Sequence, residues 1–222
     1  MGKAKLKAVA DRGYDNPPQI NACPRQRHRD DPAQADESRS GLGSRLEETR
    51  NVRAALPGIL AALKVRTFLD APCGDLNWMK HVELRPIDYI GADIVPNLIA
   101  ENYRRCSTAP GPTGMRYRCQ LLDLVTDPGP RADLVLCRDC QVHIAHKNVK
   151  KVLRNLIASG SDYLLTTTFV ARTENTDIMI GWHPINLQLP PFSWPAPIKL
   201  IDESSSEQAD KRLGLCDLRA LR

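Results

Sequence analysis

Short apolar segments alternate with helical patterns along most of this chain, and this alternation limits the folds open to it. The pattern predicts strands at about 66–70, 87–93, 115–122, 132–137 and 163–170, with two weaker candidates at 198–201 and 213–218. Apolar residues at helical spacing predict helices at about 44–63, 76–81, 96–103 and 147–158. Strands that alternate with helices form βαβ units around a parallel sheet. We therefore expect an α/β fold, with a doubly wound, mostly parallel seven-stranded sheet flanked by helices.

The first forty residues differ in composition from the rest of the 222-residue chain. They mix Pro, Gln, Asp, Arg and Ser without an apolar period, which is typical of a mobile tail. The expected organisation is a tail at 1–40 and one domain at 41–222. Ser44 and Glu47 have the spacing of a capping box and predict that the first helix begins there. Pro57 predicts a kink or a division of that helix, and Gly160 is the expected C-cap of the helix at 147–158.

Charge does not indicate a class of partner, and the cysteines point to a reducing compartment. The formal net charge of +5 is spread along the chain, without the concentrated basic patch of a nucleic-acid-binding protein. No run approaches eighteen apolar residues and no signal peptide is evident, so no membrane segment is expected. The seven cysteines are odd in number and scattered, which favours reduced thiols and a cytoplasmic location. Cys137 and Cys140 have no matching second pair, so structural thiols rather than a metal site are expected. The sequence gives no indication of the oligomeric state.

Aspartates follow several of the predicted strands. Asp70, Asp93, Asp123 and Asp139 would all lie at the carboxyl ends of strands, where open parallel sheets bind ligands. Asp93 lies 19 residues after Gly74, the spacing at which a strand-end carboxylate reaches the hydroxyl pair of a ribose. A carboxylate suits this task because it accepts two hydrogen bonds from such a diol. The pattern therefore predicts a Rossmann-like domain with a ribose-containing cofactor.

The loop at 71–75 discriminates between two classes of cofactor. It contains one glycine, and Asp75 follows that glycine directly, so the G-x-G-x-x-G pattern of dinucleotide sites is missing. A pyrophosphate needs free backbone N–H donors and is repelled by a neighbouring carboxylate. The methionyl end of S-adenosylmethionine (SAM) instead carries an ammonium and a sulfonium, which acidic residues favour. A nucleotide-dependent oxidoreductase stays open as an alternative function.

The segment from Thr67 to Met79, TFLDAPCGDLNWM, resembles the first motif of class I SAM-dependent methyltransferases. More narrowly, it is similar to an uncharacterised subgroup with Asp-Ala-Pro-Cys-Gly-Asp in this loop. Segments at 89–94, 134–140, 163–169 and 186–192 also match, so the resemblance runs from about residue 41 to the end. It implies the fold, SAM as cofactor and methyltransferase activity, but not the acceptor. The family often has a second glycine where this chain has Pro72 and Cys73, and proline removes a backbone donor.

The resemblance also implies roles for individual residues. Asp70 and Gly74 would shape the methionine pocket, and Asp93 would hold the ribose hydroxyls. Asp123 and Leu124 would flank the adenine, and the loop at 138–143 would border the transferring methyl group. The full set of cofactor-binding candidates is Asp70, Ala71, Pro72, Cys73, Gly74, Asp75, Trp78, Asp93, Ile94, Asp123, Leu124 and Arg138.

Methyl transfer is an in-line displacement, so the enzyme mainly aligns two partners and excludes water. A hydroxyl acceptor would need a base, and the candidates are His143 and Asp139, although His143 is equally consistent with a structural role. The segment at 171–197 is predicted either to wall the acceptor pocket or only to cover the sheet. The residues expected to contact the acceptor are Trp182, His183, Phe192 and Trp194.

Leu189 stands where the amine-methylating Asp/Asn-Pro-Pro-aromatic motif has its polar residue, so the Pro-Pro pair is interpreted as a rigid loop. This lowers the case for base N-methylation and leaves other nitrogen targets open. The expected acceptor is a small molecule or a sugar hydroxyl, free or in a glycan, and a protein side chain stays open. The remaining alternative is a non-catalytic SAM-binding sensor or partner subunit.

Overall fold

The structure, a computed structural model, describes residues 37–84, 86–108, 117–179 and 181–222. Its centre is one seven-stranded sheet in the order β3-β2-β1-β4-β5-β7-β6. The strands are β1 (Thr67–Asp70), β2 (Asp88–Asp93), β3 (Tyr117–Leu121), β4 (Leu134–Cys137), β5 (Tyr163–Phe169), β6 (Lys199–Asp202) and β7 (Lys211–Asp217). Strands β1 to β5 pair in parallel, whereas β7 is antiparallel to both β5 and β6. The predicted seven-stranded, mostly parallel sheet is therefore confirmed.

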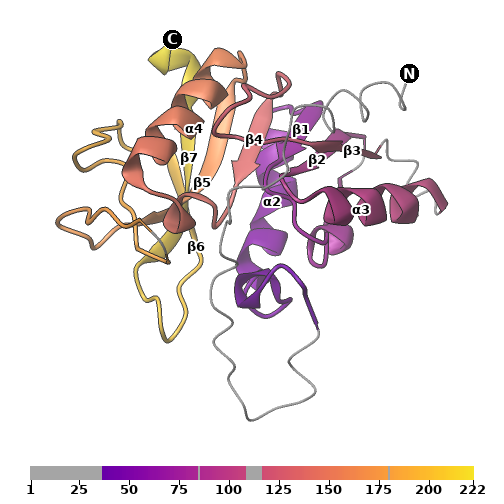
Figure 1. Cartoon of the computed structure of the whole chain (residues 1–222), viewed down its shortest axis with the longest axis horizontal. Helices are drawn as coiled ribbons and strands as arrows, with labels where there is room; N and C mark the ends of the chain where they lie inside the picture. The colour runs from indigo at the N-terminus through magenta and orange to yellow at the C-terminus, as the bar shows by residue number, and fades with distance from the viewer. Residues whose placement is uncertain (1–36, 85, 109–116, 180) are drawn as a thin grey trace.

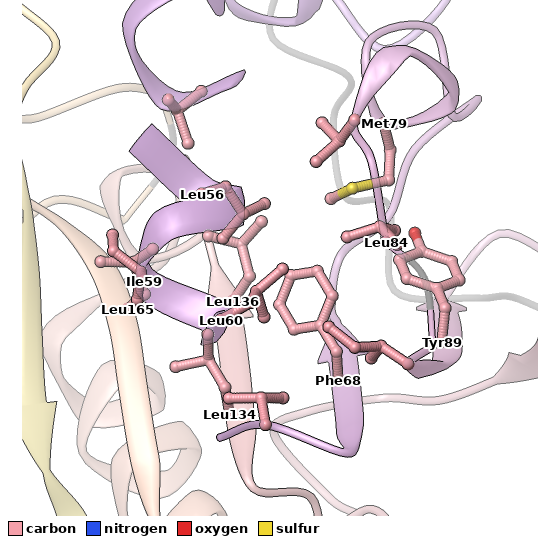
Figure 2. Close-up of a cluster of buried hydrophobic side chains, with 14 of the residues drawn as sticks. Leu56, Ile59, Leu60, Phe68, Met79, Leu84, Tyr89, Leu134, Leu136 and Leu165 are labelled. Carbon is pink, nitrogen blue, oxygen red and sulfur yellow. The ribbon is translucent and has the colours of Figure 1, made fainter. Parts of the chain in front are cut away.

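Among the described residues, three α-helices cover the sheet: α2 (Arg50–Ala62), α3 (Pro96–Thr108) and α4 (His146–Ala158) (Figure 1). Alternate residues of each strand point to opposite faces, so each strand contributes to two cores. Phe68 packs with α2 on one face, whereas its neighbour Leu69 packs with α4 on the other. Figure 2 shows Leu56 and Leu60 of α2 against side chains of β1 and β4. This two-sided burial explains why the strands read as almost continuous apolar runs.

The chain order reverses at the centre of the sheet, because β1 has β2 on one side and β4 on the other. Phe68 of β1 pairs with Tyr89 of β2 and with Leu134 of β4. Connections leave such a point in opposite directions, which opens a crevice beyond the carboxyl ends of the strands. The ends of β1, β2 and β4 therefore meet where the sequence predicts a ligand site.

Two predictions about helix starts are wrong. The expected helix at 76–81 is reduced to a single 3-10 turn at Met79–His81, because Leu76 has a left-handed φ of 59°. The first helix begins at Arg50 rather than after Ser44, which lies in a 3-10 turn at Leu42–Ser44. Pro57 lies inside an undivided helix, so the predicted division does not occur.

The boundary of the predicted tail also moves. Residues 1–36 lie outside the described part of the chain, but Glu37 to Ser40 already contact the domain. The structured part therefore begins before residue 41. The C-terminal predictions agree better, since Gly160 follows α4 with a positive φ and donates its N–H to Ile157 O. Within the described residues, no helix has the length and apolarity needed to cross a membrane.

The segment between β5 and β6, residues 170–198, has no regular helix or strand among its described residues. Ile185 and Leu187 from this segment are buried in the core beneath α4. The segment thus covers part of the α4 face of the sheet, where a further helix would otherwise be needed.

Candidate functional site

A cavity of about 430 Å³ opens at the carboxyl ends of β1, β2 and β4. The first turns of α3 and the chain just before α2 complete its walls. Its lining consists of Arg39, Ser40, Ser44, Asp70, Pro72, Cys73, Gly74, Trp78, Asp93, Val95, Asn97, Leu98, Glu101, Arg138 and Asp139. The volume is within the range of small-molecule and cofactor sites.

Asp70 is the most deeply buried acid of the cavity, with 2% of its surface exposed. It ends β1, and its Oδ2 accepts a hydrogen bond of 2.7 Å from the hydroxyl of Tyr89 on β2. Burial raises the pKa of Asp70 to about 7, although the Tyr89 hydroxyl opposes the rise. The carboxyl group is therefore poised to ionise when a cation enters the cavity.

The backbone donors of the loop after β1 are already in use. Pro72 has no N–H, and the Cys73 N–H donates to Ala92 O over 2.8 Å. The Gly74 N–H donates to Asp93 Oδ2 over 3.1 Å, and the Asp75 N–H donates to Ser40 Oγ over 2.8 Å. As a result, residues 72–75 offer no free N–H group to a phosphate.

Asp93 ends β2 and faces the cavity from the neighbouring strand. Its Oδ2 accepts from the Gly74 N–H and its Oδ1 accepts from the Val95 N–H over 3.0 Å. Burial raises the pKa of Asp93, whereas these backbone donors lower it in part. Each oxygen of a carboxylate has two acceptor sites, so both oxygens keep capacity for ligand hydroxyls.

Arg138 and Asp139, directly after β4, belong to a buried cluster of charges. Arg138 Nε donates to Glu203 over 2.7 Å, and its Nη1 lies 3.1 Å from Asp139 Oδ2. Lys211 Nζ donates to the same Asp139 oxygen over 2.8 Å, and the Thr167 hydroxyl donates to Asp139 Oδ1. Burial acts to raise the pKa of Asp139, but the two cations outweigh it and hold the pKa below its ordinary value. Asp139 is therefore a weak base with its proton-accepting oxygens occupied.

A short segment before α2, residues 37–44, forms the outer wall of the cavity, and we call it the roof segment. At one end, the Asp75 carboxylate accepts from the Ser38 hydroxyl and from the Arg39 N–H, the latter over 2.8 Å. At the other end, Gly43 O accepts from Arg138 Nη1 over 2.7 Å. The segment therefore connects the loop after β1 to the end of β4.

Gly74 lies directly beneath the roof segment. It has a φ of 57°, and a Cβ there would come within 2.4 Å of Ser40 Oγ. A side chain at this position would displace the roof segment, and the backbone conformation is one that glycine adopts most readily. The lack of a side chain at Gly74 therefore allows the backbone of the loop after β1 to lie close to the roof segment.

Eight of the residues predicted to bind cofactor or act in catalysis line the cavity. They are Asp70, Pro72, Cys73, Gly74, Trp78, Asp93, Arg138 and Asp139. Ala71, Ile94 and Asp75 lie beside it, and the Asp75 carboxylate is turned to the roof segment. Asp123 and Leu124 are outside the described lining, where Asp123 Oδ1 accepts from the Val125 N–H.

The other candidate base, His143, and the predicted acceptor contacts lie outside the described lining of this cavity. His143 ends the 3-10 turn at Gln141–His143, and burial lowers its pKa. His183 has both ring nitrogens near backbone oxygens, 2.8 Å from Thr176 O and 3.2 Å from Ile144 O. Phe192 and Trp194 pack on the core beneath α4, whereas Trp182 is 41% exposed. The roles assigned to these five residues stay predictions.

Sequence reasoning missed seven lining residues. Three belong to the roof segment, where no apolar period marks the chain: Arg39, Ser40 and Ser44. The other four follow Asp93 into α3: Val95, Asn97, Leu98 and Glu101. Helical spacing places residues 97, 98 and 101 on one face of α3. Because this helix directly follows Asp93, the sequence could have predicted that this face lines the cavity.

No protein-family model and no curated protein sequence matches the chain. Solved structures do match its fold. Magnesium protoporphyrin IX methyltransferase from Synechocystis PCC 6803 with bound SAM aligns with a TM-score of 0.53 at 13% identity, over 80% of this chain and 86% of that one. The methyltransferase domain of a bacterial Hen1 gives a TM-score of 0.54 at 11% identity, over 75% and 97%. TehB from Haemophilus influenzae gives 0.50 at 11% identity, over 74% and 60%.

The chain has the fold of SAM-dependent methyltransferases. In this sheet, the cavity lies where the strand order reverses, between β1 and its neighbours β2 and β4. Among the described residues, no three His, Cys, Asp or Glu side chains are arranged to hold a metal ion. Cys137 and Cys140 are free thiols, as are Cys73, Cys119 and Cys216.

Proposed function

We propose that this protein binds SAM in the 430 Å³ cavity and transfers its methyl group to a small-molecule or sugar hydroxyl. The observation that carries the proposal is Asp93, a buried carboxylate at the end of β2 that faces the cavity beside the loop after β1. In a methyltransferase-like fold, this carboxylate is suited to a ribose diol because each oxygen keeps acceptor capacity.

The charge of the cavity favours a cationic ligand. Four carboxyl groups line it, from Asp70, Asp93, Glu101 and Asp139, against two guanidinium groups, from Arg39 and Arg138. An excess of negative charge in a partly buried cleft attracts cations and repels polyanions. The methionyl ammonium and the sulfonium of SAM fit this charge, and Asp70 at the cavity floor is the proposed partner of the ammonium.

The same site is poorly suited to a nicotinamide dinucleotide. The N–H groups of Cys73, Gly74 and Asp75 are bonded within the protein, and Pro72 has none. A pyrophosphate would have to break these bonds and then approach the Asp75 carboxylate. The oxidoreductase alternative is therefore disfavoured.

Bound SAM would supply an activated methyl group, so the protein need only orient the acceptor, exclude water and accept one proton. Asp139 is the candidate base from the sequence that lines the cavity. Its ion pairs with Arg138 and Lys211 make Asp139 better suited to orient a group than to take a proton. We propose His143 as the base for a hydroxyl acceptor, because burial keeps its imidazole neutral near physiological pH.

A second candidate is a SAM-binding sensor or partner subunit without turnover. It is favoured by the position of His143, which is not among the described cavity-lining residues. The two candidates share the cofactor and differ in product formation.

The experiment is to incubate the protein with methyl-labelled SAM and a panel of hydroxyl acceptors, and to measure S-adenosylhomocysteine (SAH) formation beside SAM affinity. Acceptor-dependent SAH formation that falls in His143→Gln, with SAM affinity unchanged, supports the methyltransferase. Tight SAM binding without turnover on any acceptor favours the sensor, and absence of SAM binding rejects both.

A further inference from the structure

Two cations line the described part of the cavity, and they differ in how far they are open to solvent. The Arg138 guanidinium contacts Glu203, Asp139 and Gly43 O, its buried Nη2 has no hydrogen-bond partner, and its side chain is 5% exposed. Arg39 pairs with one carboxylate, that of Glu101 on α3, and both side chains are partly open to solvent. Within the described lining, Arg39 is therefore the cation that can exchange its partner for a ligand at low cost.

The backbone around Arg39 is held to the loop after β1, and its guanidinium lies partly in solvent beside Glu101. The Asp75 carboxylate accepts from the Arg39 N–H over 2.8 Å and from the Ser38 hydroxyl at 3.1 Å. The Asp75 N–H in turn donates to Ser40 Oγ. Residues on both sides of Arg39 are thus held to the loop after β1, so the guanidinium starts from a fixed point at the cavity wall. A pre-positioned guanidinium loses less freedom when it binds a ligand.

SAM carries one anionic group, the carboxylate of its methionyl part, next to the ammonium. Asp70 and Asp93 line the inner part of the cavity and would repel that carboxylate. Arg39 and Glu101 lie at the outer wall, where their side chains are 57% and 30% exposed. The charges therefore orient the methionyl group with its ammonium inward and its carboxylate toward Arg39.

We propose that Arg39 binds the methionyl carboxylate of the cofactor and that this carboxylate displaces Glu101. The inference rests on the proposed SAM site and adds a residue that the sequence motifs do not contain. A guanidinium binds a carboxylate through two parallel N–H···O hydrogen bonds, so the ligand replaces the Glu101 contact with one of the same kind. Asp75, which the motif places among the cofactor ligands, is a positioning residue for Arg39.

The test combines protein variants with a ligand that lacks the carboxylate. SAH and its decarboxylated analogue, S-adenosyl-3-thiopropylamine, are titrated calorimetrically into wild-type protein, Arg39→Gln and Glu101→Gln. Wild-type protein should prefer SAH by about tenfold, and Arg39→Gln should lose most of that preference by weakening SAH alone. Glu101→Gln should strengthen SAH binding because it removes the competing carboxylate.

Arg104→Gln is the matched control, since it removes one positive charge that acts on Glu101 from α3, at a residue outside the described cavity lining. It should leave the preference for SAH near the wild-type value. A preference that persists in Arg39→Gln overturns the inference, as does Glu101→Gln protein that binds SAH more weakly. Failure of wild-type protein to bind either ligand rejects the SAM site itself, and the inference falls with it.

Discussion

Replacing Asp70 with asparagine should change how the stability of the protein depends on pH. Burial in the folded protein raises the pKa of Asp70 from 3.8 to about 7, against the lowering effect of the Tyr89 hydroxyl. The folded chain therefore holds this proton more tightly than the unfolded chain does. The stability from this group is fully present below its unfolded pKa of 3.8 and is lost as the pH rises to about 7.

A rise from 3.8 to about 7 corresponds to about 4 kcal/mol between the two protonation states. Between about pH 5 and about pH 8, linkage gives a loss of about 2.5 kcal/mol of stability from this group. Asparagine does not titrate, and its side-chain oxygen still accepts from the Tyr89 hydroxyl. The free energy of unfolding of Asp70→Asn should therefore gain about 2.5 kcal/mol relative to wild type across that range, whatever the offset at the starting pH.

The assay is urea unfolding followed by tryptophan fluorescence at four pH values from about 5 to about 8, at constant ionic strength. Tyr89→Phe sharpens the test, because loss of the hydroxyl donor should raise the pKa of Asp70 further and move the loss of stability to higher pH. Wild-type and Asp70→Asn curves that run parallel over the whole range would refute the reasoning. They would mean that Asp70 is ionised in the folded protein throughout.

Three other changes separate binding from folding. Asp93→Ala should weaken SAH by about 1.5–3 kcal/mol with a near-normal Tm, and unchanged affinity in an unfolding protein would make Asp93 structural. Removing residues 1–36 leaves every described contact in place, so the affinity for SAH should stay unchanged. Removing residues 1–40 also deletes Ser38 and Arg39, which donate to the Asp75 carboxylate, and the same titration should then show a several-fold weaker affinity for SAH. Trp194→Ala should lower the Tm because Trp194 packs beneath α4. Trp182 is exposed, so Trp182→Ala should alter only the KM for the acceptor if Trp182 contacts it. A lower Tm in both variants would assign residues 170–198 to the core.

The strands and the strand-end acids were predictable because both depend on local pattern. Apolar runs between turn residues marked β1, β2, β4 and β5 to within two residues of their observed ends. Parallel topology then brings the ends of neighbouring strands together, so Asp70 and Asp93 had to meet in space. For this reason, the residues of the inner half of the cavity could be predicted from the sequence.

The outer half was not predictable, because it depends on polar contacts between residues far apart in the chain. The capping-box pattern at Ser44 failed since Glu37 Oε1 accepts from the Leu46 N–H, one of the donors a cap would satisfy. The helix expected at 76–81 failed because the Asp75 carboxylate accepts from the Asn77 N–H, which stabilises a turn instead. Both failures come from side-chain carboxylates, those of Glu37 and Asp75, that accept from backbone N–H groups outside a helix.

Calorimetric titration of the purified protein with SAH and, separately, with NAD⁺ tests the proposed cofactor most directly. Asp93, Asp70 and the occupied N–H groups of residues 73–75 predict saturable binding of SAH at about one site per chain, with no heat from NAD⁺. Saturable heat from NAD⁺ and none from SAH at millimolar concentration would contradict the assignment of this cavity to SAM.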